Sequence, residues 1–395
     1  MHILIAPNAF KNSLDALAVA EAIGEGLHQS KLNCNFEYFP VGDGGDGTAA
    51  LIIQKNNGIL ITGEVHDALE RKINASFGLI DKGNTAVIEL ADASGIRLLQ
   101  QHEMDPLHAT TFGTGELIKE ALDKGVSKII MCIGGSATVD GGTGILQALG
   151  IHFLNNENEI LKGLPESMVN LAVIDLSGLD KRIFNCELII LCDVENKLLG
   201  ETGAAKIFGP QKGASAEDVQ KLEETLTKFR DIALHETGND MAAIKHGGAA
   251  GGVAAALSVF CNARLVNGID YFLTITGFDE VLQKADLVIT GEGSIDAQTL
   301  QGKGPYGVAF RAKEKNIPVI GIAGKVPVTT DAQLQKYFDI LLSINNESFE
   351  ITTAIKNTKD NLVKTAKAIG DLLAMEKEVK KEIIKHMQSI LIGRR

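Results

Sequence analysis

Short apolar runs alternate with longer segments of helical period along the chain. Runs rich in aliphatic and β-branched residues predict strands at residues 2–6, 36–41, 86–90, 128–133, 187–192, 286–290, 317–322 and 338–343. Helical spacing of apolar residues predicts helices at 14–27, 116–124 and 216–234. Ser13 is the expected N-cap of the first helix, which would place Lys11 at a helix N-terminus. This alternation is typical of an α/β protein whose parallel sheets are buried on both faces.

Glycine and acidic residues are interleaved in three loops that each follow an apolar run. These loops are GDGGDG at 42–47, GGSATVDGG at 134–142 and GEGSID at 291–296. Glycine lets backbone N–H groups close around phosphate oxygens, whereas carboxylates so near a polyanion would repel it unless a divalent cation lay between them. Ligands of open α/β sheets also bind beyond the carboxyl ends of the strands. The pattern therefore points to a magnesium nucleotide.

The bulk composition narrows the class of protein. A chain of 395 residues is too long for one ordinary core and predicts two domains of roughly 150 to 200 residues. The formal net charge of -12 provides no basic face, so neither nucleic acid nor an anionic membrane is expected as a partner. Five scattered cysteines without a C-x-x-C pair, no basic leader and no apolar run of spanning length predict a soluble, cytoplasmic protein.

Other kinds of site fit the sequence less well. Residues 42–47 also satisfy the G-x-G-x-x-G fingerprint, but Asp43 and Asp46 would then face a pyrophosphate without a metal. A nicotinamide-dependent oxidoreductase acting on a small hydroxy acid stays the alternative function, and a non-catalytic nucleotide sensor is a third. Ser136 does not stand in a nucleophile elbow, because Thr138 occupies the place of the second glycine. Neither the Walker and protein-kinase signatures nor zinc-ligand spacing occurs.

A purely structural role also stays open for several of these residues. Asp43 and Asp46 could cap local N–H groups in a pair of turns, and Ser136 could cap a tight strand-to-helix turn. Asp193 could equally cap a strand end. Three loops of similar composition, all at strand ends, make the ligand-binding interpretation the stronger one.

Ordered motifs extend over almost the entire chain. They are APNAFKNSL at 6–14, PVGDGGDGT at 40–48, FGTGE at 112–116, GGSATVDGG at 134–142, CDV at 192–194, FGPQKGA at 208–214, GAAGG at 248–252, TGEG at 290–293 and QTL at 298–300. In this order they resemble the type I glycerate kinases. The resemblance implies ATP-dependent phosphorylation of D-glycerate, with 2-phosphoglycerate favoured over 3-phosphoglycerate, and magnesium as the remaining cofactor.

The resemblance also implies how the chain is divided. Both chain ends, residues 1–66 and 285–375, are expected to form a flavodoxin-like parallel-sheet domain, with a second α/β domain inserted at 67–284. Lysines alternate with apolar residues at the end of the chain, which predicts a C-terminal helical tail over 376–395. A homodimer is one assembly that the sequence allows.

Binding roles follow from the loops together with the resemblance. The expected metal ligands are Asp43, Asp46 and Glu292. The expected nucleotide-binding residues are Gly134, Gly135, Ser136, Gly291, Gly293 and Lys303. Glycerate is expected near Lys11, Ser13, Asp193 and Ser294.

Catalytic roles are expected at three positions. Asp193 or Asp296 is the expected general base for the acceptor hydroxyl, and the sequence does not decide between them. Lys11 is the expected catalytic cation, because phosphoryl transfer needs positive charge around the moving group.

Overall fold

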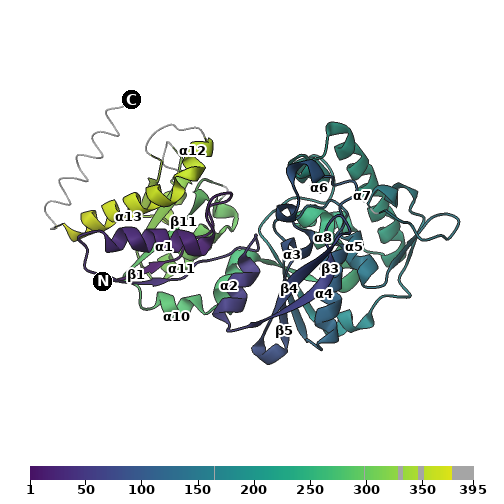
Figure 1. Cartoon of the computed structure of the whole chain (residues 1–395), viewed down its shortest axis with the longest axis horizontal. Coiled ribbons are helices and arrows are strands. Elements are labelled where there is room, and N and C mark those ends of the chain that lie inside the picture. Colours follow the sequence, from purple (N-terminus) through teal and green to yellow (C-terminus); the bar gives the residue numbers. More distant parts are fainter. Residues whose placement is uncertain (164, 298, 328–331, 346–350, 376–395) are drawn as a thin grey trace. The chain divides into compact units, whose positions relative to one another are not determined.

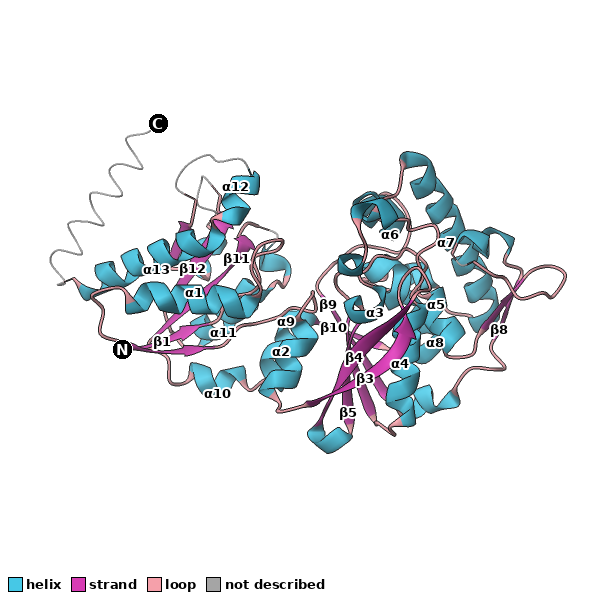
Figure 2. Ribbon diagram, viewed as in Figure 1, coloured by secondary structure: helices cyan, strands magenta, loops and turns pink. Residues whose placement is uncertain are grey.

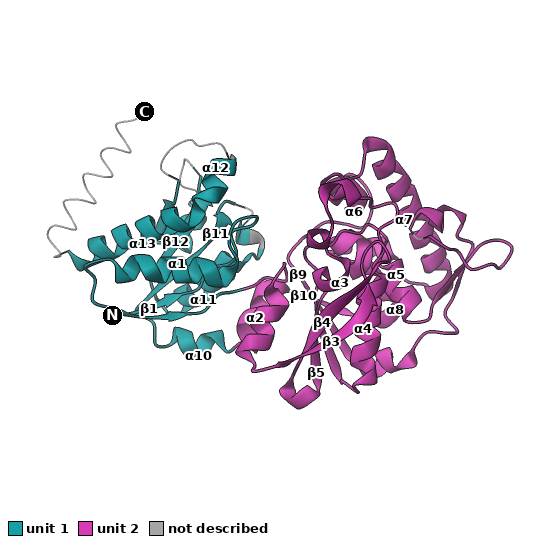
Figure 3. Ribbon diagram, in the orientation of Figure 1, with its two compact units in different colours: residues 1–41, 277–395 teal, residues 42–276 magenta. Residues whose placement is uncertain are grey.

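The chain folds into two compact units. The computed structural model describes residues 1–163, 165–297, 299–327, 332–345 and 351–375. Unit 1 consists of residues 1–41 and 277–395, and unit 2 of residues 42–276 (Figure 3). The expected two-domain α/β class, with one domain built from both chain ends, is confirmed. The helical tail expected at 376–395 lies outside the described residues.

The unit boundaries differ from the expected domain boundaries. The units divide after residues 41 and 276, whereas the sequence analysis expected divisions after residues 66 and 284. The strand β3 (Ile59–His66) explains the first difference, because it pairs along its whole length with β4 (Lys72–Ile80). Residues 42–66, including the GDGGDG loop, therefore belong with unit 2.

In its described residues, unit 1 forms a five-stranded parallel sheet in the order β13-β12-β11-β1-β2. The strands are β1 (His2–Ile5), β2 (Asn35–Tyr38), β11 (Leu287–Ser294), β12 (Val319–Lys325) and β13 (Ile340–Ser343). The helices are α1 (Ala16–His28), α10 (Phe278–Leu282), α11 (Gly304–Glu314), α12 (Ile351–Lys356) and α13 (Thr358–Ala374).

Helices cover both faces of the unit 1 sheet. Figure 1 shows α1 and α13, from opposite ends of the chain, side by side along the strands. Ile3 of β1 shares a core with Ile23 of α1 and Leu362 of α13. Leu4 points to the opposite face and is fully buried as well, while α11 packs on β11 and β12. Burial of both faces explains why these strands are continuous apolar runs.

The first helix starts later than the sequence analysis expects. Asp15, and not Ser13, is the N-cap of α1, and its carboxylate accepts a hydrogen bond from the N–H of Ala18 at 2.8 Å. The Ser13 hydroxyl instead donates to the carbonyl of Ile355 at 2.9 Å. The expectation that Lys11 lies at a helix N-terminus is therefore wrong, because Lys11 sits in a turn closed by Phe10 and Leu14.

Unit 2 is built on a larger, mixed sheet. Its described residues give a six-stranded sheet in the order β10-β9-β6-β5-β4-β3 and a two-stranded one, β7-β8. The further strands are β5 (Thr85–Glu89), β6 (Lys128–Cys132), β7 (His152–Leu154), β8 (Val173–Asp175), β9 (Glu187–Cys192) and β10 (Arg264–Asn267). The helices are α2 (Thr48–Lys55), α3 (Ala91–Ser94), α4 (Phe112–Asp123), α5 (Thr143–Ala148), α6 (Ala204–Phe208), α7 (Ala216–Thr237), α8 (Val253–Cys261) and α9 (Gly268–Ile275).

Four neighbouring strands of this sheet run parallel, and the remaining two do not. β10, β9, β6 and β5 are parallel, whereas β4 and β3 continue the sheet as antiparallel strands (Figure 2). The sequence analysis missed β3 and β4. Within the described part of the chain, no helix is long and apolar enough to cross a bilayer.

Candidate active site

The carboxyl ends of the parallel strands in unit 2 meet at one edge of the sheet. β5, β6, β9 and β10 end at Glu89, Cys132, Cys192 and Asn267. The GDGGDG loop packs across this edge, where the N–H of Gly134 donates to the carbonyl of Gly44 at 3.0 Å. Two of the three predicted loops, 42–47 and 134–142, therefore lie together.

Glycine allows the backbones to approach this closely. A Cβ on Gly134 would lie 2.5 Å from the Cα of Gly45, and a Cβ on Gly268 would lie 1.7 Å from the carbonyl oxygen of Asp43. Gly44, with φ +100°, would bring a Cβ within 2.9 Å of the Leu191 carbonyl oxygen. The GDGGDG loop is thus held between the ends of β6, β9 and β10 with no room for side chains at these points.

Glu89 is a buried acid beneath the GDGGDG loop. It is 4% exposed, and its carboxyl oxygens accept from the N–H groups of Gly47 at 2.7 Å and Ala49 at 3.1 Å. Burial, together with the side chain of Asp46, raises the pKa of Glu89 to about 8. Glu89 is therefore protonated at neutral pH. The sequence analysis gave it no role, although an acidic residue at the end of an apolar run is a usable signal.

The two aspartates of the GDGGDG loop have different surroundings. Asp43 is buried, and its carboxylate accepts a long hydrogen bond from the N–H of Gly45 at 3.4 Å. Asp46 is half exposed and forms an ion pair with Nε of Arg97 at 3.2 Å. Arg97 also pairs with Asp92, whose pKa is raised by burial. A guanidinium thus already balances part of the charge on Asp46.

The described carboxylates are better suited to a magnesium ion held by Asp43 and by phosphate oxygens than to one held by a cluster of protein ligands. Over the described ranges, no group of three or more His, Cys, Asp or Glu side chains could hold a metal ion. Magnesium in nucleotide sites commonly needs only one or two carboxylates, because phosphates and water complete its octahedron. Asp43 can serve in this way, whereas Asp46 would have to leave Arg97. The third expected ligand, Glu292, belongs to unit 1.

A wholly buried carboxylate organises the loop at 134–142. Asp140 accepts hydrogen bonds from the N–H and hydroxyl of Thr111 and from the N–H groups of Gly142 and Gly144, at 2.6 to 3.2 Å. Burial raises the pKa of Asp140, and these donors oppose that shift. The loop conformation is therefore set by a network inside the protein.

Lys212 lies beneath the same loop. It ends the 3-10 turn Pro210–Lys212, is 4% exposed, and donates through Nζ to Oγ of Ser136 and to the carbonyl of Thr138, both at 2.7 Å. Burial lowers the pKa of Lys212 to about 7. The sequence analysis quoted Lys212 within the FGPQKGA motif but assigned it no role.

The strand ends of unit 1 form a second cluster. The N–H of Asn8, just after β1, donates to the carbonyl of Gly291 in β11 at 2.8 Å. A Cβ on Gly293 would lie 3.7 Å from the backbone nitrogen of Lys11. Lys303 directly precedes α11, whose first residue, Gly304, packs against the Asn8 side chain. The structure thus gathers the expected residues Lys11, Gly291, Gly293 and Lys303 at one edge.

Polar side chains of the GEGSID loop bond to Thr299 and to each other at this edge. Glu292 is buried and accepts from the hydroxyl of Thr299 at 2.9 Å. The hydroxyl of Ser294 donates to the Asp296 carboxylate at 3.4 Å. The hydroxyl of Ser13 bonds elsewhere, since it donates to the carbonyl of Ile355. In unit 2, Asp193 follows β9 directly and is half-buried.

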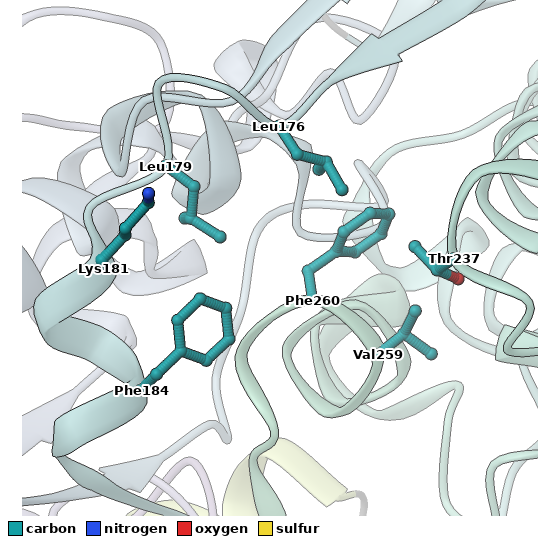
Figure 4. Close-up of a pocket in the computed structure, with 7 residues that line it drawn as sticks. All are labelled: Leu176, Leu179, Lys181, Phe184, Thr237, Val259 and Phe260. Atoms are coloured by element: carbon teal, nitrogen blue, oxygen red, sulfur yellow. The ribbon is translucent and has the colours of Figure 1, made fainter.

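An apolar hollow of about 330 Å³ opens elsewhere on unit 2. Its lining residues are Leu176, Leu179, Lys181, Phe184, Thr237, Val259 and Phe260 (Figure 4). None of the glycine-rich loops or strand-end acids contributes to it. Apart from Lys181 and Thr237 its lining is apolar, and no glycine-rich loop offers backbone N–H groups there, so the strand ends remain the candidate active site.

Parallel sheets that carry glycine-rich, charged loops at their strand ends define the class as an α/β enzyme with its site at those ends. The family model described as "Glycerate kinase family" matches residues 3–374. This chain therefore belongs to the glycerate kinase family, and it is a kinase.

Individual relatives agree over almost their full lengths. The chain is 42% identical to the glycerate kinase of Bacillus subtilis (strain 168), covering 95% of this chain and 99% of the relative. It is 41% identical to the glycerate 2-kinase of Escherichia coli (strain K12), covering 95% and 98%. A crystal structure from Salmonella typhimurium LT2 assigned to glycerate kinase 2 aligns with a TM-score of 0.78 at 41% identity, covering 94% of this chain and 98% of that chain.

Proposed function

We propose that this enzyme transfers the γ-phosphoryl group of ATP to D-glycerate and forms 2-phosphoglycerate rather than 3-phosphoglycerate. Family membership supports glycerate as acceptor, and the glycerate 2-kinase name of the relative from Escherichia coli supports the 2-position. The observation that carries the proposal is the packing of the Gly134 loop on the GDGGDG loop, with a buried lysine beneath it. Such an arrangement suits a polyphosphate.

The nucleotide phosphates bind to backbone N–H groups in this proposal. Gly134, Gly135 and Ser136 supply them in unit 2, and Gly291 and Gly293, with Lys303, are the candidates in unit 1. Gly135 has φ +70°, a conformation that turns successive N–H groups toward a common anion.

Magnesium completes the nucleotide site. Asp43 is the preferred carboxylate, with Asp46 and Glu292 as further ligands, directly or through water. When bound, the ion neutralises the phosphate oxygens and so lowers the charge that the acceptor must approach.

The acceptor side of the reaction uses the remaining expected residues. The residues proposed to bind glycerate are Lys11, Ser13 and Ser294 in unit 1 and Asp193 in unit 2. The ammonium of Lys11 can pair with a carboxylate or a phosphoryl oxygen. Asp193 or Asp296 takes the proton of the attacking hydroxyl. The reaction takes place in the cytoplasm, in keeping with the five free cysteines of the described chain, and a homodimer stays a prediction.

A single reaction series tests the proposal. The purified enzyme is incubated with D-glycerate, ATP and Mg²⁺, and the product is identified by ³¹P and ¹³C NMR. ADP release that requires D-glycerate and a phosphate on carbon 2 is expected. ATP binding without glycerate-dependent turnover would instead indicate a nucleotide sensor, and phosphate on carbon 3 would overturn the choice of hydroxyl. Reduction of a nicotinamide by glycerate, measured in parallel, is not expected.

A further inference from the structure

The ammonium of Lys212 lies in the protein interior, and among the described residues its recorded hydrogen-bond partners include no carboxylate. Nζ bonds to two neutral oxygens, those of Ser136 and Thr138. Asp140 is the charged group that acts on Lys212 electrostatically, but the recorded hydrogen bonds of its carboxylate go to Thr111 and to backbone N–H groups. The nearest aromatic face, Phe208 of α6, lies 6.0 Å from Nζ. A buried cation without a contacting anion is costly unless an anion joins it.

Ser136 links this cation to the accessible side of the loop. A serine hydroxyl has one donor and two acceptor positions, so a hydroxyl that accepts from an ammonium must direct its own proton elsewhere. In the described part of the chain, the hydrogen-bond partner recorded for Oγ of Ser136 is Lys212. Ser136 retains 8% exposure, whereas Lys212 lies beneath it. The O–H of Ser136 is therefore a donor that still lacks an acceptor.

A second polar group of the loop is also unsatisfied. Thr138 is fully buried, and within the described residues its Oγ1 has no hydrogen-bond partner. Buried hydroxyls normally find a partner, so an orphan indicates a ligand or water that completes the site. The spare O–H of Ser136 and this hydroxyl stand two residues apart in the same loop.

We infer that Lys212 and Ser136 form a relay that binds a phosphoryl group of the nucleotide, in which the buried ammonium polarises the Ser136 hydroxyl and that hydroxyl donates to a phosphoryl oxygen. The relay rests on the proposed function and adds a mechanism of nucleotide binding to it. Because the relay needs a protonated amine, the protein takes up a proton at Lys212 when the nucleotide binds. With a neutral amine, Ser136 donates to Nζ and offers nothing to a ligand. Once the amine is protonated, Nζ donates to Oγ and the Ser136 proton is released toward the phosphate.

The relay predicts a pH dependence with a defined sign. With a pKa of about 7, Lys212 is protonated in only a minority of molecules at pH 7.5. Binding of an anion that requires the charged amine must therefore add roughly three quarters of a proton per molecule. The affinity for nucleotide is therefore greatest below pH 7 and falls as the pH rises above it. Asp140 is the charged group that acts on Lys212; burial raises its own pKa, while hydrogen bonds from Thr111, Gly142 and Gly144 oppose that shift.

Proton-linked calorimetry tests the relay. Binding of Mg²⁺ with a β,γ-imido analogue of ATP is titrated at pH 7.5 in two buffers of different ionisation enthalpy, for the wild type, Lys212→Met and Ser136→Ala. We expect proton uptake by the wild type, its loss in Lys212→Met, and at least tenfold weaker binding in both variants. Lys206→Met, which removes a surface lysine paired with Glu201, is the matched control and should match the wild type.

The outcomes separate the relay from the proposed function. If the wild type binds the analogue without proton uptake, or if both variants keep wild-type affinity and uptake, the relay is wrong while nucleotide binding stands. If the wild type does not bind the analogue at all, the proposed use of ATP fails and the relay fails with it. Ser136→Ala, a small change at a loop position, keeps the test decisive should Lys212→Met not fold.

Discussion

The strand ends of the two units place their charges differently. In unit 2, three ionisable side chains lie beneath the loops, since Glu89, Asp140 and Lys212 are each at most 4% exposed. In unit 1, Glu292 is also buried, but Lys11 is exposed, and Asp296 and Lys303 are half-buried. Buried charges act through a medium of low dielectric and are already oriented, whereas exposed ones are screened and adjust to a ligand. The strand ends of unit 2 are therefore preformed for a ligand, whereas those of unit 1 can adjust to one.

The identity of the general base bears most directly on this comparison, because one candidate lies in each unit. We expect either Asp193→Asn or Asp296→Asn to lower kcat by about 10²- to 10⁴-fold with little change in KM for glycerate, since only the transition state needs the proton acceptor. Steady-state kinetics of both variants checks this. Near-wild-type turnover of both would show that neither carboxylate is the base.

Glu89 should make the stability of unit 2 depend on pH. Its pKa is raised to about 8, so the folded protein holds a proton between pH 4.5 and 8 that the unfolded chain releases. Stability is therefore lost as the pH rises through this window, and Glu89→Gln should remove the loss. The free energy of unfolding of the variant relative to the wild type should rise by ~4 kcal/mol from pH 5 to pH 9.

Glu187→Gln is the control for this measurement. Glu187 pairs with Lys128 and Arg264, which lower its pKa, so it stays ionised from pH 5 to pH 9. Its difference from the wild type should be constant across that range. A Glu89→Gln difference that is equally flat would mean that Glu89 is ionised in the folded protein at neutral pH.

The contact between the two loops of unit 2 should be sensitive to a single methyl group. In Gly134→Ala the new Cβ would meet backbone of Gly45, so the loops must separate, and we expect kcat/KM for ATP to fall about tenfold. Gly125→Ala is the control, because it adds strain at φ +77° but meets nothing within 4 Å. It should cost ~1 kcal/mol of stability and leave the kinetics unchanged. Wild-type kinetics in Gly134→Ala would show that the contact is not needed.

The smallest effect is expected in unit 1. Ser13→Ala removes the hydrogen bond to the carbonyl of Ile355 and should lower the free energy of unfolding by ~1 kcal/mol in urea denaturation. If Ser13 also binds glycerate, KM for glycerate rises in the same variant. A change in stability with an unchanged KM would restrict Ser13 to a structural role.

Much of this fold could be predicted, because its central strands are buried on both faces. The apolar run at 128–133 corresponds to β6, and that at 187–192 corresponds to β9. β3 was missed because it lies at the sheet edge, where its short apolar run at 59–61 is largely exposed and polar residues and a glycine follow it at 62–64. Ser13 was mistaken for a helix cap because Asp15, two residues later, is an equally good one.

The site was predictable only in part. The rule that ligands bind at strand ends singled out the loops at 42–47 and 134–142, but the expected domain boundaries assigned them to different domains. The structure instead brings them to one edge of unit 2, where the N–H of Gly134 donates to the carbonyl of Gly44. Lys212 was given no role, because its importance depends on a contact that the sequence does not show. Only in the folded chain does Ser136, 76 residues away, lie against its ammonium. Glu89 was missed for a similar reason, since its pKa depends on tertiary burial and on Asp46.

A crystal structure with Mg²⁺ and a β,γ-imido analogue of ATP would show directly where the nucleotide binds. We expect the triphosphate on the N–H groups of Gly134 to Ser136, with the Ser136 hydroxyl donating to a phosphoryl oxygen and magnesium beside Asp43. A nucleotide bound in the apolar hollow around Phe184 and Phe260, or anywhere that leaves both glycine loops of unit 2 without contact to phosphate, would contradict it.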